Sequence, residues 1–218
     1  DKRLDSIAAL VNPKQVIPTC MKFVDIAGLV AGAAQGEGLG NKFLANIREV
    51  QAIVHVVRCF DDPEVTHVAG YVNPIDDIET IDTELCLADL DAVEKAQDKA
   101  AKIAKSGDKE ARAKLVVLDR LHGYLGSEGP IRNIKDLSEL EQEVIEQMQL
   151  LSAKPVLYVA NVSEDQLEDN PYVDMLAGYA KEHDSHVIVV CAAIEAELSE
   201  LDDEDKVSFL EDLGLAES

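Results

Sequence analysis

The sequence contains no tryptophan, and aromatic residues make up only 4% of its 218 residues. Because 47% of the residues are hydrophobic, a core can form, but aliphatic side chains must fill most of it. No run of about eighteen apolar residues occurs, so the sequence predicts no membrane-spanning helix. No signal peptide is visible either. We therefore expect a cytoplasmic protein without a membrane partner, built as one domain with an insertion or as two small domains.

Cysteine is also scarce, and its spacing fits neither a metal site nor a redox motif. The four cysteines are Cys20, Cys59, Cys86 and Cys191, and three of them lie in or beside apolar runs. We expect buried, reduced thiols of the kind found in cytosolic proteins.

Basic residues are outnumbered, with 20 Lys and Arg against 43 Asp and Glu, which gives a net charge of −23. Such a charge argues against nucleic-acid binding by the whole surface. One segment departs from this balance, because residues 95–120 carry eight basic and four acidic side chains, a local charge of 8 − 4 = +4. We predict a basic finger that contacts RNA phosphates, with Lys95, Lys99, Lys102 and Lys105 as candidates. The alternative is an ordinary solvated helical face.

The most informative absence is the motif Gly-x-x-x-x-Gly-Lys-Ser/Thr, with which P-loop NTPases bind phosphates and Mg²⁺. The stretch most similar to this motif runs from Gly36 to Lys42, but Phe43 follows the lysine in place of Ser or Thr. We interpret this glycine-rich stretch as a mobile loop that responds to the phosphate state. Two other motifs of such a domain are present, so we expect most of a nucleotide switch domain without its first roughly fifty residues, about one βαβ unit plus a loop.

Short apolar runs bounded by turn residues predict the strands of a largely parallel sheet. We expect strands at residues 19–25, 52–60, 155–161 and 186–191, and helices at residues 40–50 and 176–182. Alternation of strands and helices is typical of an α/β fold.

Between residues 80 and 151 the pattern becomes purely helical, with apolar residues spaced by three and four. Breaks at Ser106-Gly107 and at residues 126–130 predict an antiparallel helical hairpin followed by a third helix. We therefore divide the chain into a first part of the α/β domain (1–79), a helical insertion (80–151) and a second part (152–218).

The first of the two motifs is Asp-x-x-Gly at residues 25–28, which ends an apolar run. At the carboxyl edge of a sheet, Asp25 would hold a water ligand of Mg²⁺, and the Gly28 N–H group would approach the γ-phosphate. A tetrapeptide of this kind on its own is also explained by capping or by a turn.

The residue after Gly28 is Leu29, where many GTPases carry a glutamine that orients the attacking water. A leucine side chain cannot form a hydrogen bond with water, so hydrolysis needs another group. His67, on the loop after the second predicted strand, is our catalytic candidate because a histidine can donate or accept near neutral pH. The alternative is a simple surface histidine. His55 lies inside an apolar strand, and we expect it to be a core residue.

The second motif, Asn-Val-Ser-Glu at residues 161–164, stands where GTPases read guanine with Asn-Lys-x-Asp. Val162 replaces the lysine, and Glu164 is one methylene longer than the usual aspartate, which weakens the bidentate contact to guanine. Asn161 and the Val162 backbone can still bind the amino edge of adenine. Backbone N–H groups of Cys191, Ala192 and Ala193 follow the last predicted strand and can approach the base.

Together these stretches resemble one family, the YchF or Obg-like ATPases among the P-loop NTPases. The resemblance covers essentially the whole chain. It rests on residues 25–30 (Asp-Ile-Ala-Gly-Leu-Val), 36–44 (Gly-Glu-Gly-Leu-Gly-Asn-Lys-Phe-Leu), 55–60 (His-Val-Val-Arg-Cys-Phe), 161–164 (Asn-Val-Ser-Glu) and 191–195 (Cys-Ala-Ala-Ile-Glu).

The resemblance implies a P-loop NTPase G domain with a coiled-coil insertion, ATP preferred over GTP, a requirement for Mg²⁺ and slow hydrolysis to ADP and phosphate with rearrangement of the switch loops. It also implies association with ribosomes or ribosomal RNA, and we expect a monomer. Family members begin with a P-loop and end with a small β-rich TGS domain, so the chain matches their central portion. The alternative function is a non-catalytic module that docks RNA or protein partners through its helical hairpin.

Overall fold

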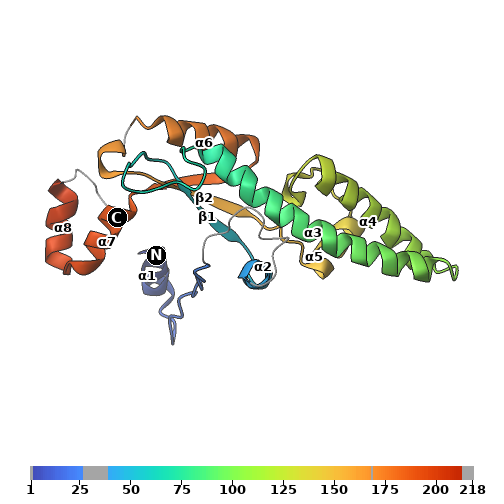
Figure 1. The fold of residues 1–218 in the computed structure, drawn as a ribbon. Coiled ribbons are helices and arrows are strands. Elements are labelled where there is room, and N and C mark those ends of the chain that lie inside the picture. Colours follow the sequence, from blue (N-terminus) through green and yellow to red (C-terminus); the bar gives the residue numbers. More distant parts are fainter. Residues whose placement is uncertain (1, 27–38, 168, 213–218) are drawn as a thin grey trace.

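The centre of the molecule is a sheet of three parallel strands. The computed structural model describes residues 2–26, 39–167 and 169–212. The strands are β1 (Ile53–Arg58), β2 (Val156–Asn161) and β3 (His186–Val190), and they lie in the order β1-β2-β3 (Figure 1). In register, Arg58 lies opposite Asn161, which lies opposite Val190. The carboxyl ends of all three strands therefore meet at one edge, which is where parallel sheets bind ligands.

The chain begins with α1 (Lys2–Val11), which lies apart from the sheet (Figure 1). Of the helices next to the strands in the chain, α2 (Leu39–Glu49) precedes β1, and α6 (Pro171–Glu182) lies between β2 and β3. The short 3₁₀ helix η2 (Glu164–Gln166) follows β2, while α7 (Ala192–Glu200) and α8 (Asp203–Asp212) follow β3. Asn170 caps α6, because its Oδ1 accepts from the N–H group of Tyr172 at 2.9 Å and from that of Val173 at 3.4 Å.

The core around the sheet is aliphatic apart from one tyrosine, as the composition predicts. Tyr158 of β2 is almost fully buried, and its ring lies 6.0 Å from those of His55 and Tyr179. The other buried members come from the strands, from the residue after each strand, and from α3, α6 and α7: Val57, Cys59, Ile78, Ala160, Val162, Leu176, Ala180, Cys191, Ile194 and Leu198. His55 of β1 is half-buried beside Tyr158, at the margin of this core, and burial lowers its pKa.

The helical part begins with α3 (Pro74–Ala104), a helix of 31 residues that starts beside the sheet and projects away from it (Figure 1). It ends before Gly107, whose φ of +94° is a conformation that glycine adopts without a Cβ clash. The chain returns in α4 (Lys109–Ser127), passes through η1 (Ile131–Asn133) and enters α5 (Glu139–Met148). The predicted hairpin, its break at Ser106-Gly107 and the third helix are therefore confirmed.

The hairpin has its own core, separate from that of the sheet. Its buried members are Cys86, Val93, Ala100, Val117, Leu118, Leu121, Leu125, Ile131, Val144, Ile145 and Leu150. A stripe of apolar side chains three and four residues apart on α3 faces a matching stripe on α4, which is the geometry of packed antiparallel helices.

Buried polar contacts fasten the base of the hairpin to the sheet side of the molecule. The Asp89 carboxylate of α3 accepts hydrogen bonds from Leu151 N at 2.9 Å, from Ser152 N at 2.8 Å and from Ser152 Oγ at 2.7 Å. Two turns nearer the sheet, Asp82 forms an ion pair with Arg132 of η1, and each side chain is only 10% exposed. These bonds satisfy groups that would be costly to bury alone.

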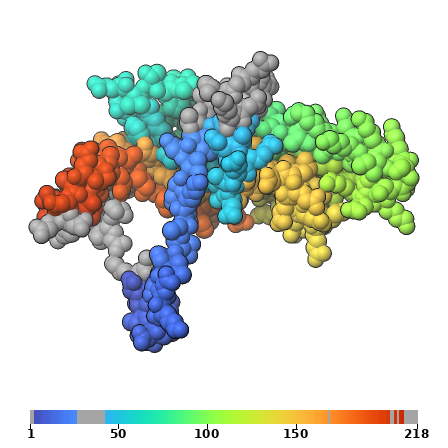
Figure 2. Space-filling view, turned by 90° about the horizontal axis from the view of Figure 1, so that it is seen from below, coloured from blue at the N-terminus to red at the C-terminus, as the bar shows by residue number. Residues whose placement is uncertain are grey.

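The strand predicted at residues 19–25 is wrong. Residues 15–26 form neither helix nor strand, and apolar side chains there are exposed, with Met21 at 79% and Phe23 at 73%. A strand requires a hydrogen-bonded neighbour, and within the described residues β1 pairs only with β2. Figure 2 shows the N-terminal segment, in blue, extending away from the body of the molecule. An apolar run therefore does not predict a strand when the partner is missing.

The α/β fold with a parallel sheet and a large helical part is confirmed. The helices predicted at residues 40–50 and 176–182 correspond to α2 and α6. Because α3 already begins at Pro74, the division of the chain at residue 80 falls inside a continuous helix and stays a prediction.

No helix in the described part of the chain is long and apolar enough to cross a membrane. Three cysteines are buried and all four are free, but Cys20 is exposed, which corrects the expectation for that thiol.

Candidate functional site

Asn161, predicted to bind the base, is the last residue of β2 and lies at the carboxyl edge of the sheet. Its Oδ1 accepts a hydrogen bond from the Ala192 N–H group at 3.1 Å, and its carbonyl oxygen accepts one from Cys59 N–H at 2.8 Å. The side chain thus ties the end of β2 to the start of α7. Its Nδ2 amide donates to none of the described residues and remains a donor for a ligand.

The predicted contact of Val162 with a base is through its backbone, and it stays a prediction. Its side chain is only 2% exposed and belongs to the core around the sheet, so it cannot pack on a base as the stem of a lysine would. Its N–H group donates to the Val190 carbonyl at 3.0 Å. The group that Val162 can offer to an amino group is therefore its carbonyl oxygen.

Two further predicted residues, Ala192 and Ala193, form the first turn of α7 and are exposed. Cys191 precedes them at the N-cap, and its buried side chain accepts no capping hydrogen bond. The N–H groups at the start of a helix lack partners within the helix and carry a partial positive charge. Because both residues are small, a flat ligand could approach this backbone closely. Glu164, exposed at the start of η2, lies three residues after Asn161 in the chain.

His67 lies on the loop that leaves the same edge of the sheet after β1. Its Nε2 is 3.1 Å from Oδ2 of Asp77, in the first turn and a half of α3, and its Nδ1 accepts from the Ala69 N–H group at 3.2 Å. The second contact requires an unprotonated Nδ1, so Nε2 carries the hydrogen and donates it to Asp77. Both ring nitrogens are therefore occupied in this conformation.

Arg58, at the end of β1, shapes the loop that carries His67. Its Nε donates to the Phe60 carbonyl at 3.0 Å, its Nη1 to the Val65 carbonyl at 2.8 Å and its Nη2 to the Asp62 carbonyl at 3.3 Å. The guanidinium also lies 4.6 Å above the Phe60 ring. A single side chain thereby holds three carbonyl groups of the loop in place.

The predicted phosphate and metal positions are only partly visible. Gly28 and Leu29 lie outside the described residues. Asp25 is exposed and does not end a strand, so its indirect role at Mg²⁺ stays a prediction. No cluster of three His, Cys, Asp or Glu side chains that could hold a metal ion occurs in residues 2–26, 39–167 and 169–212. A single carboxylate suits contact with Mg²⁺ through a water, since this ion keeps several waters when it binds to proteins.

The four candidate lysines follow α3 toward the tip of the hairpin, and Lys95, Lys99, Lys102 and Lys105 are all exposed. Lys95 is paired with Asp91 one turn earlier, at 2.5 Å between Nζ and Oδ2. The other three have no carboxylate within ion-pair distance in the part of the chain that the structure describes. Positions 95, 99 and 102 share one face of the helix. The three lysines nearest the tip of the hairpin are therefore more available to RNA phosphates than Lys95 is.

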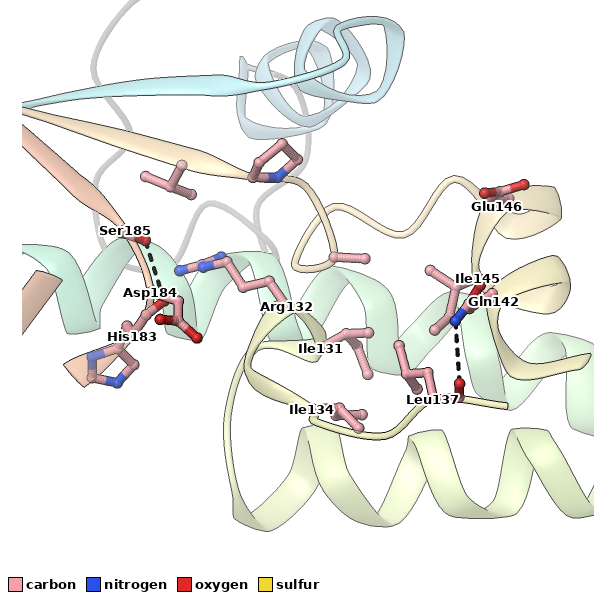
Figure 3. Close-up of a pocket in the computed structure, with 13 residues that line it drawn as sticks. Ile131, Arg132, Ile134, Leu137, Gln142, Ile145, Glu146, His183, Asp184 and Ser185 are labelled. Atoms are coloured by element: carbon pink, nitrogen blue, oxygen red, sulfur yellow. Dashed lines mark hydrogen bonds between the residues drawn. The ribbon is translucent and has the colours of Figure 1, made fainter. Parts of the chain in front are cut away.

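A hollow of about 460 Å³ lies at the opposite end of the strands. Figure 3 shows it among η1, α5 and the turn before β3. Ile131, Arg132, Gln142, Ile145 and His183 are among the residues that line it. Because Val156 and Ser185 at its rim lie at the amino ends of β2 and β3, this hollow lies away from Asn161 and does not belong to the predicted base site.

Some residues that build the site act only through backbone contacts and were not predicted from the sequence. Asn170 donates from Nδ2 to the Cys59 carbonyl at 2.8 Å while its Oδ1 caps α6, so it joins the loop after β2 to the end of β1. Arg58 and Asp77 act in the same indirect way. The pair Asn170-Pro171 could have indicated the start of α6, because asparagine before proline is typical of the beginning of a helix.

Several known proteins that are similar to this chain carry the name YchF. The ribosome-binding ATPase YchF of Haemophilus ducreyi is 55% identical over 217 residues, and the match covers 100% of this chain and 60% of that protein. The solved structure of the Schizosaccharomyces pombe YchF GTPase matches with a TM-score of 0.81 at 34% identity, again over 100% of this chain and 60% of the other. Along its whole length, the chain is similar to proteins of the YchF family.

Other YchF proteins match in the same way. The ribosome-binding ATPase YchF of Bacillus subtilis is 51% identical over 221 residues, and the match again covers 100% of this chain and 60% of that protein. No model of a protein family matches the chain. The chain thus spans 60% of the length of these three YchF relatives, and the resemblance that its motifs carry is confirmed.

Proposed function

We propose that this chain is part of a ribosome-associated nucleotide hydrolase that prefers ATP to GTP and uses Mg²⁺. In the whole protein, ATP would be hydrolysed to ADP and phosphate, and the switch loops would rearrange with the phosphate state. The names of the YchF relatives, ribosome-binding ATPase and GTPase, support nucleotide hydrolysis and ribosome binding. The cytoplasm is the compartment that this function requires.

The observation that carries the proposal is the convergence of base-binding groups at one edge of the sheet. Asn161, its bond to the Ala192 N–H group and the exposed start of α7 bring a side-chain amide and helix N–H groups to the end of β2. The carboxyl edge of a parallel sheet is also where α/β proteins bind nucleotides. A module that only docks partners would not need these groups there.

Adenine is favoured over guanine for a stereochemical reason. The Val162 carbonyl oxygen can accept from the exocyclic amino group of adenine, while guanine presents a carbonyl oxygen at the corresponding position. Glu164 reaches one methylene farther than the aspartate that binds guanine in a bidentate manner. The site therefore lacks the contact by which GTPases reject adenine.

Hydrolysis requires a group that positions water, and His67 is the proposed one because the leucine at position 29 has no polar atom. Mg²⁺, when bound, would neutralise charge on the phosphates and would be contacted by Asp25 through a water. The ribosomal contact would be made by Lys95, Lys99, Lys102 and Lys105 at the end of the first hairpin helix, through attraction to RNA phosphates.

The test of base choice compares ATP and GTP affinities of the whole protein with those of a Glu164→Asp variant. Glu164 is exposed, so the substitution leaves the core intact. Partial restoration of a bidentate contact, worth about 1–3 kcal/mol when complete, should shift the ratio of the two Kd values toward GTP by about fivefold. Asp165→Glu, the matched control in the same 3₁₀ helix, should leave the ratio unchanged. An identical ratio in both variants would refute this account of base choice.

The second candidate function is a docking module without catalysis, favoured by the exposed lysines at the hairpin tip. Purified whole protein that binds ribosomes but shows no turnover of ATP or GTP would support it. Turnover that His67→Ala abolishes would exclude it, because general acid–base groups contribute about 10²–10⁴-fold to rates.

A further inference from the structure

The loop of residues 61–73 is held against the start of α3 by two carboxylates. Asp77 receives the hydrogen bond from His67 Nε2 at 3.1 Å. Asp76, its neighbour, accepts from the Tyr71 hydroxyl at 2.8 Å, a bond that raises the pKa of Tyr71. The first two turns of α3 therefore form the surface on which this loop rests.

Local hydrogen bonds at the start of α3 hold Asp77 in position. Asn73 caps α3 through its Oδ1, which accepts from the Ile75 N–H group at 3.1 Å, and Pro74 occupies the first helical position. The Asp77 N–H group donates to the Asn73 carbonyl at 3.2 Å. Burial and, second, the Asp77 carboxylate raise the pKa of Cys59, the residue that follows β1, to about 11.

The ring of His67 is less free than that of a surface histidine. Its side chain is 15% exposed, and that of Asp77 is 31% exposed. The Ala69 N–H group occupies Nδ1, and the Asp77 carboxylate occupies Nε2. A histidine in this state has neither a lone pair nor an N–H group left for a water molecule, so it cannot orient one.

We propose that Asp77 is a positioning residue that latches His67 in a resting state, and that hydrolysis requires this contact to open. The inference rests on the proposed role of His67 in hydrolysis. Opening the Asp77 contact frees the Nε2–H group, while the bond from Ala69 continues to define the tautomer. The loop needs no other change to present a donor to water, because Arg58 holds its first half by three carbonyl groups.

The expected effect follows from the strength of the contact. A partly exposed hydrogen bond contributes about 0.5–1.5 kcal/mol, which corresponds to a roughly 2- to 12-fold excess of the latched form. Asp77→Ala should therefore raise kcat for ATP by up to that factor and leave KM nearly unchanged, since the ring does not bind ATP in the resting state. Asp77→Asn, which keeps a weaker neutral acceptor, should give a smaller increase.

The kinetic experiment measures kcat and KM for ATP in the whole protein with Asp77→Ala, Asp77→Asn and the matched control Asp76→Ala. The control removes the same charge from the same helix and releases Tyr71 while leaving the His67 contact intact. Asp77→Ala in a His67→Ala background should give no increase. A decrease in kcat with Asp77→Ala, or an equal increase with Asp76→Ala, would overturn the latch.

A second measurement examines the contact without turnover. In the 218-residue chain, the His67 Nε2–H proton should give a resolved NMR signal, because the carboxylate protects it from exchange with water, and the signal should vanish in Asp77→Ala. An unchanged signal would refute the latch and leave the proposed hydrolysis untouched. A whole protein that shows no hydrolysis would instead refute the proposed function and, with it, the role of the latch.

Discussion

The ion pair between Asp82 and Arg132 is predicted to hold the helical hairpin on the sheet, and its loss should be severe. Arg132→Met leaves the Asp82 carboxylate at 10% exposure without its cation. Removing one partner of a buried pair costs about 3–5 kcal/mol, because an uncompensated charge remains in the interior. The variant also loses the contact from Arg132 Nη1 to the Ser152 carbonyl, which is long at 3.5 Å and adds little.

The magnitude can be compared with the whole stability of the protein. Domains have free energies of unfolding of about 5–15 kcal/mol, so this one substitution removes a large part of the total. At about 2–4 °C per kcal/mol for a chain of this size, Tm should fall by roughly 6–20 °C.

The assay is urea unfolding of the 218-residue chain followed by circular dichroism, with Tm as a second readout. The matched control is the pair of Lys95 and Asp91, whose side chains are 69% and 65% exposed. Lys95→Met should cost no more than about 0.5 kcal/mol, since solvent screens exposed pairs within one helix.

A double variant separates the charge effect from packing. Asp82→Leu combined with Arg132→Met removes both charges and should recover most of the stability that Arg132→Met loses, because no unpaired charge is left in the interior. A loss below about 1 kcal/mol for Arg132→Met, comparable with the control, would refute the reasoning. A double variant less stable than the single one would show that packing, and not charge, dominates at this joint.

Two further predictions concern the hairpin and α5, the helix that follows it. Replacing Lys99, Lys102 and Lys105 by glutamate should weaken co-sedimentation of the whole protein with ribosomes and lower the salt dependence by about one phosphate contact per lysine, whereas Lys181→Glu on α6 should change neither. Hydrogen bonds from Ser138, and then from Arg120, lower the pKa of Glu141. The stability that these bonds contribute is therefore present above the ordinary carboxyl pKa of about 4.3, and it is lost as the pH falls through the lowered pKa of Glu141. Ser138→Ala should therefore cost about 0.5–2 kcal/mol in urea at neutral pH and less at acid pH; a cost that is the same at both would contradict this.

The sequence predicted those parts of the fold whose signals are local. The spacing of apolar residues indicated the helices of the hairpin, and Gly107 marked its turn, because both depend on neighbours within a few residues. Asn161 at the end of β2 followed from one apolar run and one polar residue. These predictions needed no knowledge of distant contacts.

The parts that could not be predicted depend on partners far away in the chain. The apolar run at residues 19–25 has the composition of a strand, yet no described strand pairs with it. The carboxylates of Asp77, Asp82 and Asp89 are ordinary acidic residues in a long helix until folding brings His67, Arg132 and Ser152 against them. Likewise, Val162 takes the place of a ligand-facing lysine in the motif, but its side chain lies in the core.

The continuity of α3 has a mechanical consequence. At about 1.5 Å per residue, its 31 residues extend about 46 Å, with the carboxylate that holds His67 near one end and the lysines of the hairpin tip near the other. If the helix tilts as a rigid body about the buried ion pair of Asp82, a tilt of a few degrees beside the sheet becomes a displacement of a few ångströms at its far end. A change too small to disturb the core could thus be transmitted as a movement at the tip.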